Sequence, residues 1–153
     1  MSSLCALCCK SGEGRNFPWK SDNAYVKVSS KDSNGVFSLI EDNITTEFHL
    51  PRHCHYIHSE TFYVVSGRVE FILDDRTEIL TNGDTLHVPR GVAHEVRGLD
   101  SSTKMLTFYE PGGLEGLFEA YEQMDPADFS DPQKMKEIET RFDSITLGPK
   151  EST

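Results

Sequence analysis

Residues 53–60 read HCHYIHSE, which places two histidines two positions apart and a glutamate after them. Side chains two apart on a β-strand point to the same face, so His53 and His55 can direct their rings at one point. The intervening residues are enough for a turn, which would bring Glu60 in from the next strand. His94 follows a Pro-Arg-Gly turn signal and is positioned to supply a third imidazole from a separate strand.

The histidines are strongly clustered, because all 6 of them lie between His49 and His94. Such clustering favours a functional site over scattered core or surface histidines. Three neutral nitrogens and one carboxylate suit one divalent ion of iron, manganese, nickel, cobalt, copper or zinc better than calcium or magnesium. Four protein ligands leave room for one or two further ligands on a five- or six-coordinate metal, and catalysis needs that room.

The stretch from about residue 24 to 110 alternates short apolar segments with turn signals. That pattern predicts an all-β sandwich or barrel. The strands expected from it are 24–28, 36–40, 61–65, 68–73, 78–80, 85–88, 92–97 and 104–109.

After residue 113 the hydrophobic spacing changes to that of an amphipathic helix. This stripe consists of Leu114, Leu117, Phe118 and Tyr121. Asp131 followed by Pro132 is typical of a helix N-cap with proline at the first position. We therefore expect two C-terminal helices that cover the open end or the outer face of the barrel. The expected division is an N-terminal segment at 1–20, a barrel at 21–112, helices at 113–146 and a tail at 147–153.

Two stretches resemble the paired sequence motifs of the cupin superfamily. Residues 47–67 correspond to G-x5-H-x-H-x3,4-E-x6-G, and residues 83–98 correspond to G-x5-P-x-G-x2-H-x3-N. The matching positions are His53, His55, Glu60, Gly67, Gly83, Pro89, Gly91 and His94. The resemblance implies a small cupin jelly-roll β-barrel that holds a metal through His53, His55, Glu60 and His94.

The chain departs from these motifs at two positions. Glu47 stands where the first motif opens with glycine, and Gly98 stands where the second closes with asparagine. Neither position is a ligand in the family, so the implied metal set is unaffected. Glu47 and His49 share the parity of His53, and we expect a rim or packing role for them, with a place in the cavity as the alternative.

The single-domain layout resembles quercetin 2,3-dioxygenase-like cupins. This implies a metal-dependent oxygenase that acts on a small enolised or phenolic compound, with O2 as co-substrate and Glu60 as ligand and then base. We expect an apolar cavity wall that includes Phe62, Val64, Phe71 and Leu73. The alternatives are a metal-using isomerase, cyclase or lyase, and a non-catalytic binding or storage barrel. The family also leads us to expect a homodimer.

Composition limits the remaining possibilities. The chain carries 15 Lys and Arg against 25 Asp and Glu, a net charge of −10, which disfavours binding to nucleic acids or anionic membranes. No apolar run approaches the roughly 20 residues of a membrane-spanning helix. The N-terminus is a poor signal peptide, so we expect a cytoplasmic location.

The remaining cysteines and histidines lead to weaker expectations. Cys5, Cys8 and Cys9 crowd the N-terminus, where a mobile tail is favoured over a zinc site. Cys54 should point away from the metal by strand parity. We expect His58 to be a solvated turn residue. For His87, a position behind the metal ligands and a position on the surface are equally favoured.

Overall fold

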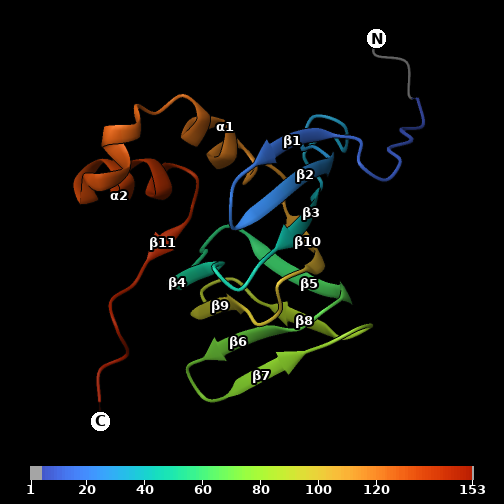
Figure 1. Ribbon diagram of the computed structural model, residues 1–153. Helices are drawn as coiled ribbons and strands as arrows, with labels where there is room; N and C mark the ends of the chain where they lie inside the picture. Colours follow the sequence, from blue (N-terminus) through green and yellow to red (C-terminus); the bar gives the residue numbers. More distant parts are fainter. Residues whose placement is uncertain (1–4, 153) are drawn as a thin grey trace.

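The computed structural model describes residues 5–152, in which two antiparallel β-sheets enclose a core and short helices lie at one end (Figure 1). The first sheet has the order β1-β2-β3-β10-β5-β8 and the second has the order β11-β4-β9-β6-β7. The first sheet consists of β1 (Arg15–Pro18), β2 (Asp22–Val28), β3 (Ser38–Ile44), β10 (Thr103–Glu110), β5 (Ser59–Ser66) and β8 (Thr85–Val88). The second consists of β11 (Ile145–Thr146), β4 (His49–Cys54), β9 (His94–Gly98), β6 (Val69–Leu73) and β7 (Thr77–Leu80). This architecture confirms the predicted all-β cupin jelly-roll.

Alternation of side chains along the strands builds the core between the sheets. In β10, Met105, Thr107 and Tyr109 are buried, whereas the residues between them are more exposed. The rings of Phe62 and Phe71 meet across the sheets with their centroids 4.8 Å apart. The core cluster around them consists of Ile44, Phe48, Val64, Val69, Leu80, Val88, Val96 and Met105.

The eight predicted strands correspond to β2, β3 and β5 to β10; the ends of β8 are as predicted, the others are shifted, and the largest shift is in β3. Strands β1, β4 and β11 were not in that prediction, although strand geometry was expected at His53 and His55. Strand β1 comes from the segment expected to precede the barrel and pairs with β2 along its whole length. It is only four residues long and buries one side chain fully, Phe17, so its sequence shows no alternation to recognise.

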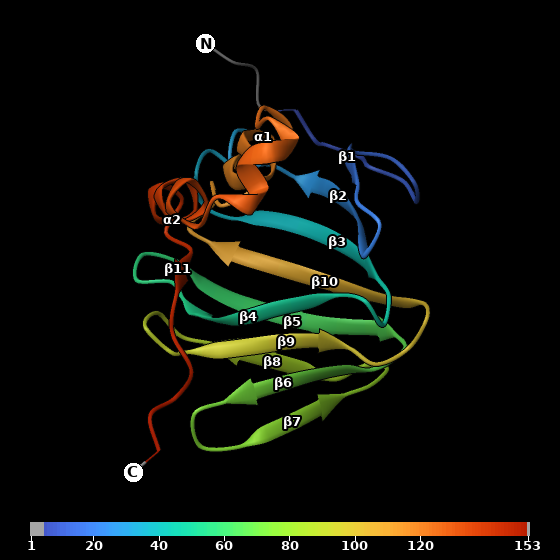
Figure 2. The ribbon, with the colours of Figure 1, turned by 60° about the vertical axis from the view of Figure 1, so that its left-hand side comes forward.

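Both predicted C-terminal helices are present. They are α1 (Gly116–Glu122) and α2 (Pro132–Arg141), with a 3₁₀ turn at Pro126–Ser130 between them. The Asp131 side chain accepts hydrogen bonds from the backbone N–H groups of Gln133 and Lys134, at 3.0 and 3.3 Å, which confirms the predicted N-cap. Figure 2 shows both helices toward one end of the stack of strands, and the C-terminal segment running on from α2 through β11, which pairs with β4 at the edge of the second sheet.

The two departures from the cupin motifs have simple local explanations. A Cβ atom at Gly98 would lie 2.2 Å from the carbonyl oxygen of Thr45, so this position has no room for an asparagine. Glu47 is exposed and forms an ion pair with Lys20 at 3.0 Å. Neither residue belongs to the group of potential metal ligands.

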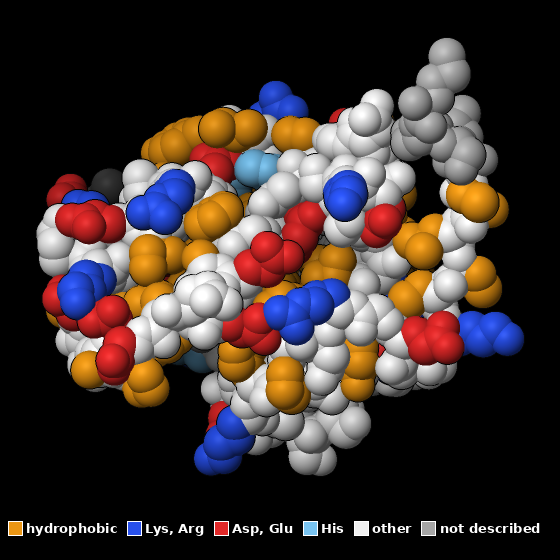
Figure 3. Space-filling view, turned by 90° about the horizontal axis from the view of Figure 1, so that it is seen from above, with side chains coloured by type: hydrophobic (Ala, Val, Ile, Leu, Met, Phe, Trp, Pro, Cys, Tyr) orange, Lys and Arg blue, Asp and Glu red, His pale blue; other side chains and the backbone are white. Residues whose placement is uncertain are grey.

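The surface is mixed in character. On the face that carries the helices, hydrophobic side chains lie between acidic and basic ones (Figure 3). Within the described part of the chain, no helix has the length and apolar character needed to cross a membrane. Cys5 and Cys8 are exposed in the loop before β1, Cys9 is partly buried there, and the structure does not group them with other potential metal ligands within residues 5–152.

Candidate metal site

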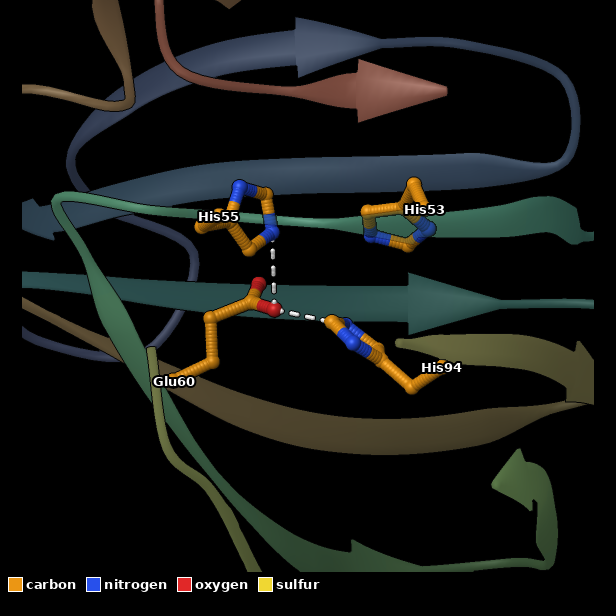
Figure 4. A group of neighbouring side chains, drawn as sticks. All are labelled: His53, His55, Glu60 and His94. Atoms are coloured by element: carbon orange, nitrogen blue, oxygen red, sulfur yellow. Dashed lines mark ion pairs between the residues drawn. The ribbon is translucent and has the colours of Figure 1, made fainter. Parts of the chain in front are cut away.

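Four side chains from three strands and one turn converge between the two sheets (Figure 4). His53 lies in β4, and His55 follows directly after that strand. Glu60 lies near the start of β5 and His94 opens β9, where it pairs in register with His53. One ligand atom from each residue lies within 4.8 Å of the others, and all four residues are buried. The structure thus brings together the four residues that the sequence singled out.

Backbone carbonyls fix the orientation of the three rings. The Nδ1 atoms of His53 and His55 lie 2.7 Å from the carbonyl oxygens of Pro51 and Asp143, respectively. His94 Nδ1 lies 3.1 Å from the carbonyl oxygen of Val92. A carbonyl oxygen can only accept, so each Nδ1 carries a proton, and in the neutral rings each Nε2 offers its lone pair. This outer support is the arrangement that metal-binding histidines use.

The centre of the cluster lacks a positive partner. Glu60 Oε2 lies 3.0 Å from His55 Nε2 and 2.8 Å from His94 Nε2. With the protons on Nδ1, these three atoms are all acceptors, and none of them has a hydrogen-bond donor. Buried acceptors without a donor are costly, and a cation among them removes that cost. The donor set therefore fits a divalent transition metal.

The electrostatics of these groups agree with a cation site. Burial acts to raise the pKa of Glu60, but His55 and His94 hold it well below its usual range. Burial acts to lower the pKa of His55, and the Glu60 carboxylate outweighs it and raises this pKa. Burial and the neighbouring His94 lower the pKa of His53 to about 4, so that ring stays neutral near pH 7.

The turn between the ligands is held by Asp143, which lies between α2 and β11. Its carboxylate accepts hydrogen bonds from the backbone N–H groups of Tyr56, Ile57 and His58, at 2.8–2.9 Å. The His58 ring contributes a further contact, with Nδ1 2.8 Å from Asp143 Oδ2. His58 is therefore buried. The prediction that it is a solvated turn residue was wrong, because its ring contacts the Asp143 carboxylate.

Asp143 lies 88 residues from His55 and was missed at the sequence level. Its φ of 61° gives it a left-handed backbone conformation, which aspartate tolerates better than most residues. No local sequence pattern connects this position with a turn that lies so far away along the chain. Strand β11 follows it and pairs with β4, placing Thr146 opposite His53. The C-terminal segment thus completes the wall of the metal site.

The other singled-out polar residues lie outside the cluster. His49 is exposed, 2.8 Å from Glu95 Oε1, and it lines a cavity that Glu60 also lines. His87 is exposed, and its ring lies 2.8 Å from the Thr61 hydroxyl, so it is a surface residue. Cys54 is buried but does not belong to the group of potential ligands, in line with strand parity.

A cavity of about 320 Å³ opens beside Glu60, between the sheets and the helices. Its wall is mainly apolar and aromatic and includes Trp19, Phe48, Leu50, Phe62, Met105, Phe118, Tyr121 and Phe129. A smaller hollow of about 120 Å³ is lined by His53, His55 and Glu60. The two hollows share Leu50, Glu60, Tyr109, Phe118 and Tyr121, so they adjoin at the carboxylate.

The four residues expected in the cavity wall have different positions. Phe62 lines the cavity. Val64 and Phe71 are fully buried in the core cluster, because they lie farther along their strands from Glu60. Leu73 lines a separate surface hollow together with Arg52 and Asp74. The wall contributed by the helices and by Trp19 was not anticipated, because it comes from segments outside the barrel motifs.

Comparison with known proteins defines the class. Residues 45–109 match the family model of the cupin domain, and with the observed fold this places the chain among the cupins. The sequence is similar to two quercetin 2,3-dioxygenases. The one from Bacillus subtilis is 32% identical over 110 residues, covering 71% of this chain and 32% of that enzyme. The one from Aspergillus japonicus is 35% identical over 98 residues, covering 60% of this chain and 28% of that enzyme.

The chain spans about a third of the length of these two relatives. Over the matched part, its sequence is that of a quercetin dioxygenase-like cupin. Among solved structures, the polyketide cyclase RemF from Streptomyces resistomycificus superposes with a TM-score of 0.61 at 20% identity, covering 70% of this chain and 80% of that one. At that identity the likeness concerns the fold.

Proposed function

We propose that this cupin is a metal-dependent oxygenase that acts on a small phenolic or enolised ring compound. The observation that carries the proposal is the convergence of buried, donorless acceptor atoms at the inner end of an apolar cavity. The sequence similarity to quercetin 2,3-dioxygenases supports the choice of reaction class. His53, His55, Glu60 and His94 would hold the metal.

A divalent metal in this position supplies a Lewis acid that lowers the pKa of a coordinated substrate hydroxyl and a redox centre for reaction with O2. The protein supplies the base. Glu60 is the only carboxylate in the cluster, and the lowered pKa keeps it ionised and able to accept a proton from a hydroxyl group that enters beside it.

Tyr109 lies beside that carboxylate. It pairs in register with Glu60, and both residues line the cavity. Burial and the nearby negative charge of Glu60 raise the pKa of Tyr109 well above its usual range. The phenol therefore keeps its proton and is available in the cavity as a hydrogen-bond donor rather than as a base.

The cavity determines the shape of the substrate. Phe62, Trp19 and Phe118 offer aromatic surfaces, and Phe118 packs edge-on against Trp19 with their centroids 5.1 Å apart. Apolar walls of this kind bind flat rings and exclude water from the reacting end. We infer that a ring system enters between the sheets and places an oxygen next to Glu60.

Oxygen consumption with quercetin tests the proposal. Protein purified without chelators and loaded separately with each candidate metal is mixed with quercetin in an oxygen electrode. We expect O2 uptake that depends on quercetin and on the metal and is lost in His55→Ala. Turnover that continues unchanged under strict anaerobiosis would instead assign the site to an isomerase, cyclase or lyase. Folding stability unaffected by metal or chelation, together with no turnover, would leave a binding barrel.

A further inference from the structure

Two buried carboxyl groups interrupt the apolar wall of the cavity beside Glu60. Asp22 opens β2 and Asp42 lies in β3, and both line the cavity while being only 6% and 7% exposed. Charged residues are rarely buried without a partner or a function. Neither residue belongs to the metal cluster, so a different role is needed to explain them.

Strand register places these groups on the same inner face as Glu60. In the ladder, Asp42 pairs with Met105, and Thr107, two residues farther along β10, pairs with Phe62. Tyr109, two residues farther again, pairs with Glu60. The Asp22 and Asp42 carboxyls therefore lie on the inner face two or three strands away from the metal-site carboxylate, across the cavity.

The carboxyl pair is short of hydrogen-bond donors. The Thr107 hydroxyl donates to Asp42 Oδ2 at 2.6 Å. Asp22 Oδ1 is fully buried and receives no hydrogen bond from any described group. Within residues 5–152, no lysine or arginine lines this cavity, and its one histidine, His49, is paired with Glu95 at the rim.

We propose that Asp22, supported by Asp42, is a second recognition point that accepts a hydrogen bond from a ring hydroxyl of the substrate. The inference rests on the proposed function, because it assumes that a ring compound enters the cavity with one oxygen beside Glu60. It adds that the substrate carries a further hydroxyl at its other end. The preferred class is thus a polyhydroxylated ring compound rather than one with a single oxygen function.

Counting donors and acceptors favours a hydroxyl over an ammonium group. A hydroxyl has one proton to donate, which matches the single unpaired oxygen of Asp22. An ammonium group brings three donors and needs acceptors beyond that one oxygen, whereas most of the residues that line the cavity are apolar or aromatic. Burial and the neighbouring Asp42 raise the pKa of Asp22, which reduces the negative charge of the pair and weakens its attraction for a cation.

Anaerobic binding to the metal-loaded protein tests this without any turnover. The probes are quercetin and 3-hydroxyflavone, which keeps the oxygens next to the central ring but lacks the other hydroxyls. Titration calorimetry and the fluorescence of Trp19, the chain's 1 tryptophan, which lines the cavity, report affinity. The variants are Asp22→Leu, which removes the acceptor at similar size, and Asp22→Asn, which keeps one oxygen. Glu41→Gln is the matched control, because Glu41 precedes Asp42 on the opposite face of β3 and contacts Lys104.

We expect wild type and Glu41→Gln to bind quercetin ~10-fold more tightly than 3-hydroxyflavone. This preference should fall to within about twofold in Asp22→Leu and lie between the two in Asp22→Asn. A preference that persists in folded, metal-loaded Asp22→Leu, or in Asp22→Asn if the leucine variant does not fold, would overturn the proposal. Failure of wild type to bind quercetin would also overturn it.

Tyramine, a phenolic amine, tests whether the carboxyl pair binds a cationic ligand instead. Asp22-dependent binding of tyramine, without Asp22-dependent preference for quercetin, would assign the carboxyl pair to a cationic ligand and overturn the proposal. An Asp22-dependent preference in a protein that does not consume O2 would support this recognition point while refuting the oxygenase. O2 consumption without that preference would support the oxygenase and refute this recognition point.

Discussion

Removal of the Asp143 carboxylate should make the turn between His55 and Glu60 less rigid, and the metal site with it. In Asp143→Ala, the backbone N–H groups of Tyr56, Ile57 and His58 and the His58 ring all lose their acceptor. Hydrogen bonds to a buried charged group contribute about 1.5–3 kcal/mol each, but contacts to one group are not additive. Alanine in the left-handed conformation adds about 1 kcal/mol.

We therefore expect Asp143→Ala to lower the free energy of unfolding of the metal-free protein by about 3–5 kcal/mol. For a domain of this size, that corresponds to a fall in Tm of roughly 10 °C, measured by circular dichroism. The turn between His55 and Glu60 would also lose its fixed shape. We expect metal affinity, measured by competition with a chelator, to fall by about 10- to 100-fold.

Two further variants separate the backbone from the carboxylate. Asp143→Gly relieves the left-handed conformation but removes the acceptor, so it should lose metal affinity like alanine with a smaller loss of stability. Asp143→Asn keeps the conformation and one acceptor oxygen, so it should lie closest to wild type. An unchanged Tm in Asp143→Ala, or a lowered Tm with metal affinity intact in all three variants, would refute the reasoning.

Other predictions concern the ligands, the cavity and pH. His55→Ala should lose most bound metal by elemental analysis, whereas His58→Ala should keep it and lose stability through Asp143; the reverse order would contradict the ligand assignment. Metal occupancy should fall as pH drops below neutral, because protons compete with the metal for the ligand nitrogens and Glu60 raises the pKa of His55, and equal occupancy at pH 5 and pH 8 would count against histidine ligation. Burial and the adjacent carboxyl raise the pKa of Asp22 to about 9, so the folded state keeps a proton that the unfolded chain releases near pH 4. Stability in urea should therefore fall as pH rises from about 4 toward 9, and Asp22→Asn should flatten this slope; equal slopes would oppose a buried proton. Phe62→Ala should raise KM for a ring substrate more than it lowers kcat, and steady-state kinetics with an unchanged KM would remove Phe62 from the cavity wall.

The metal cluster could be predicted from the sequence because its geometry is mostly local. His53 and His55 share a strand face by parity, and Glu60 follows after one turn. His94 was the one distant member, and the second motif identified it. The eight predicted strands were equally visible, because the longer ones show their period and turn signals bound the short ones.

The residues that were missed depend on long-range contacts. Asp143 reaches the turn at residues 56–58 from beyond α2, and nothing in its neighbourhood in the sequence signals that contact. Asp42 did leave a signal, because it falls between Ile40 and Ile44 at inward positions of β3. Only part of the expected cavity wall lines the cavity. Strand parity identifies which side chains face inward, but it does not show where the cavity ends and the packed core begins, and Val64 and Phe71 lie in that core.

Metal content together with an anomalous difference map from a crystal would test the central claim most directly. We predict close to one transition-metal ion per chain in protein prepared without chelators, with its anomalous peak bonded to His53, His55, Glu60 and His94, and its loss in His94→Ala. A crystal of metal-saturated protein with no peak among these four side chains, or with the ion bound elsewhere, would contradict the account.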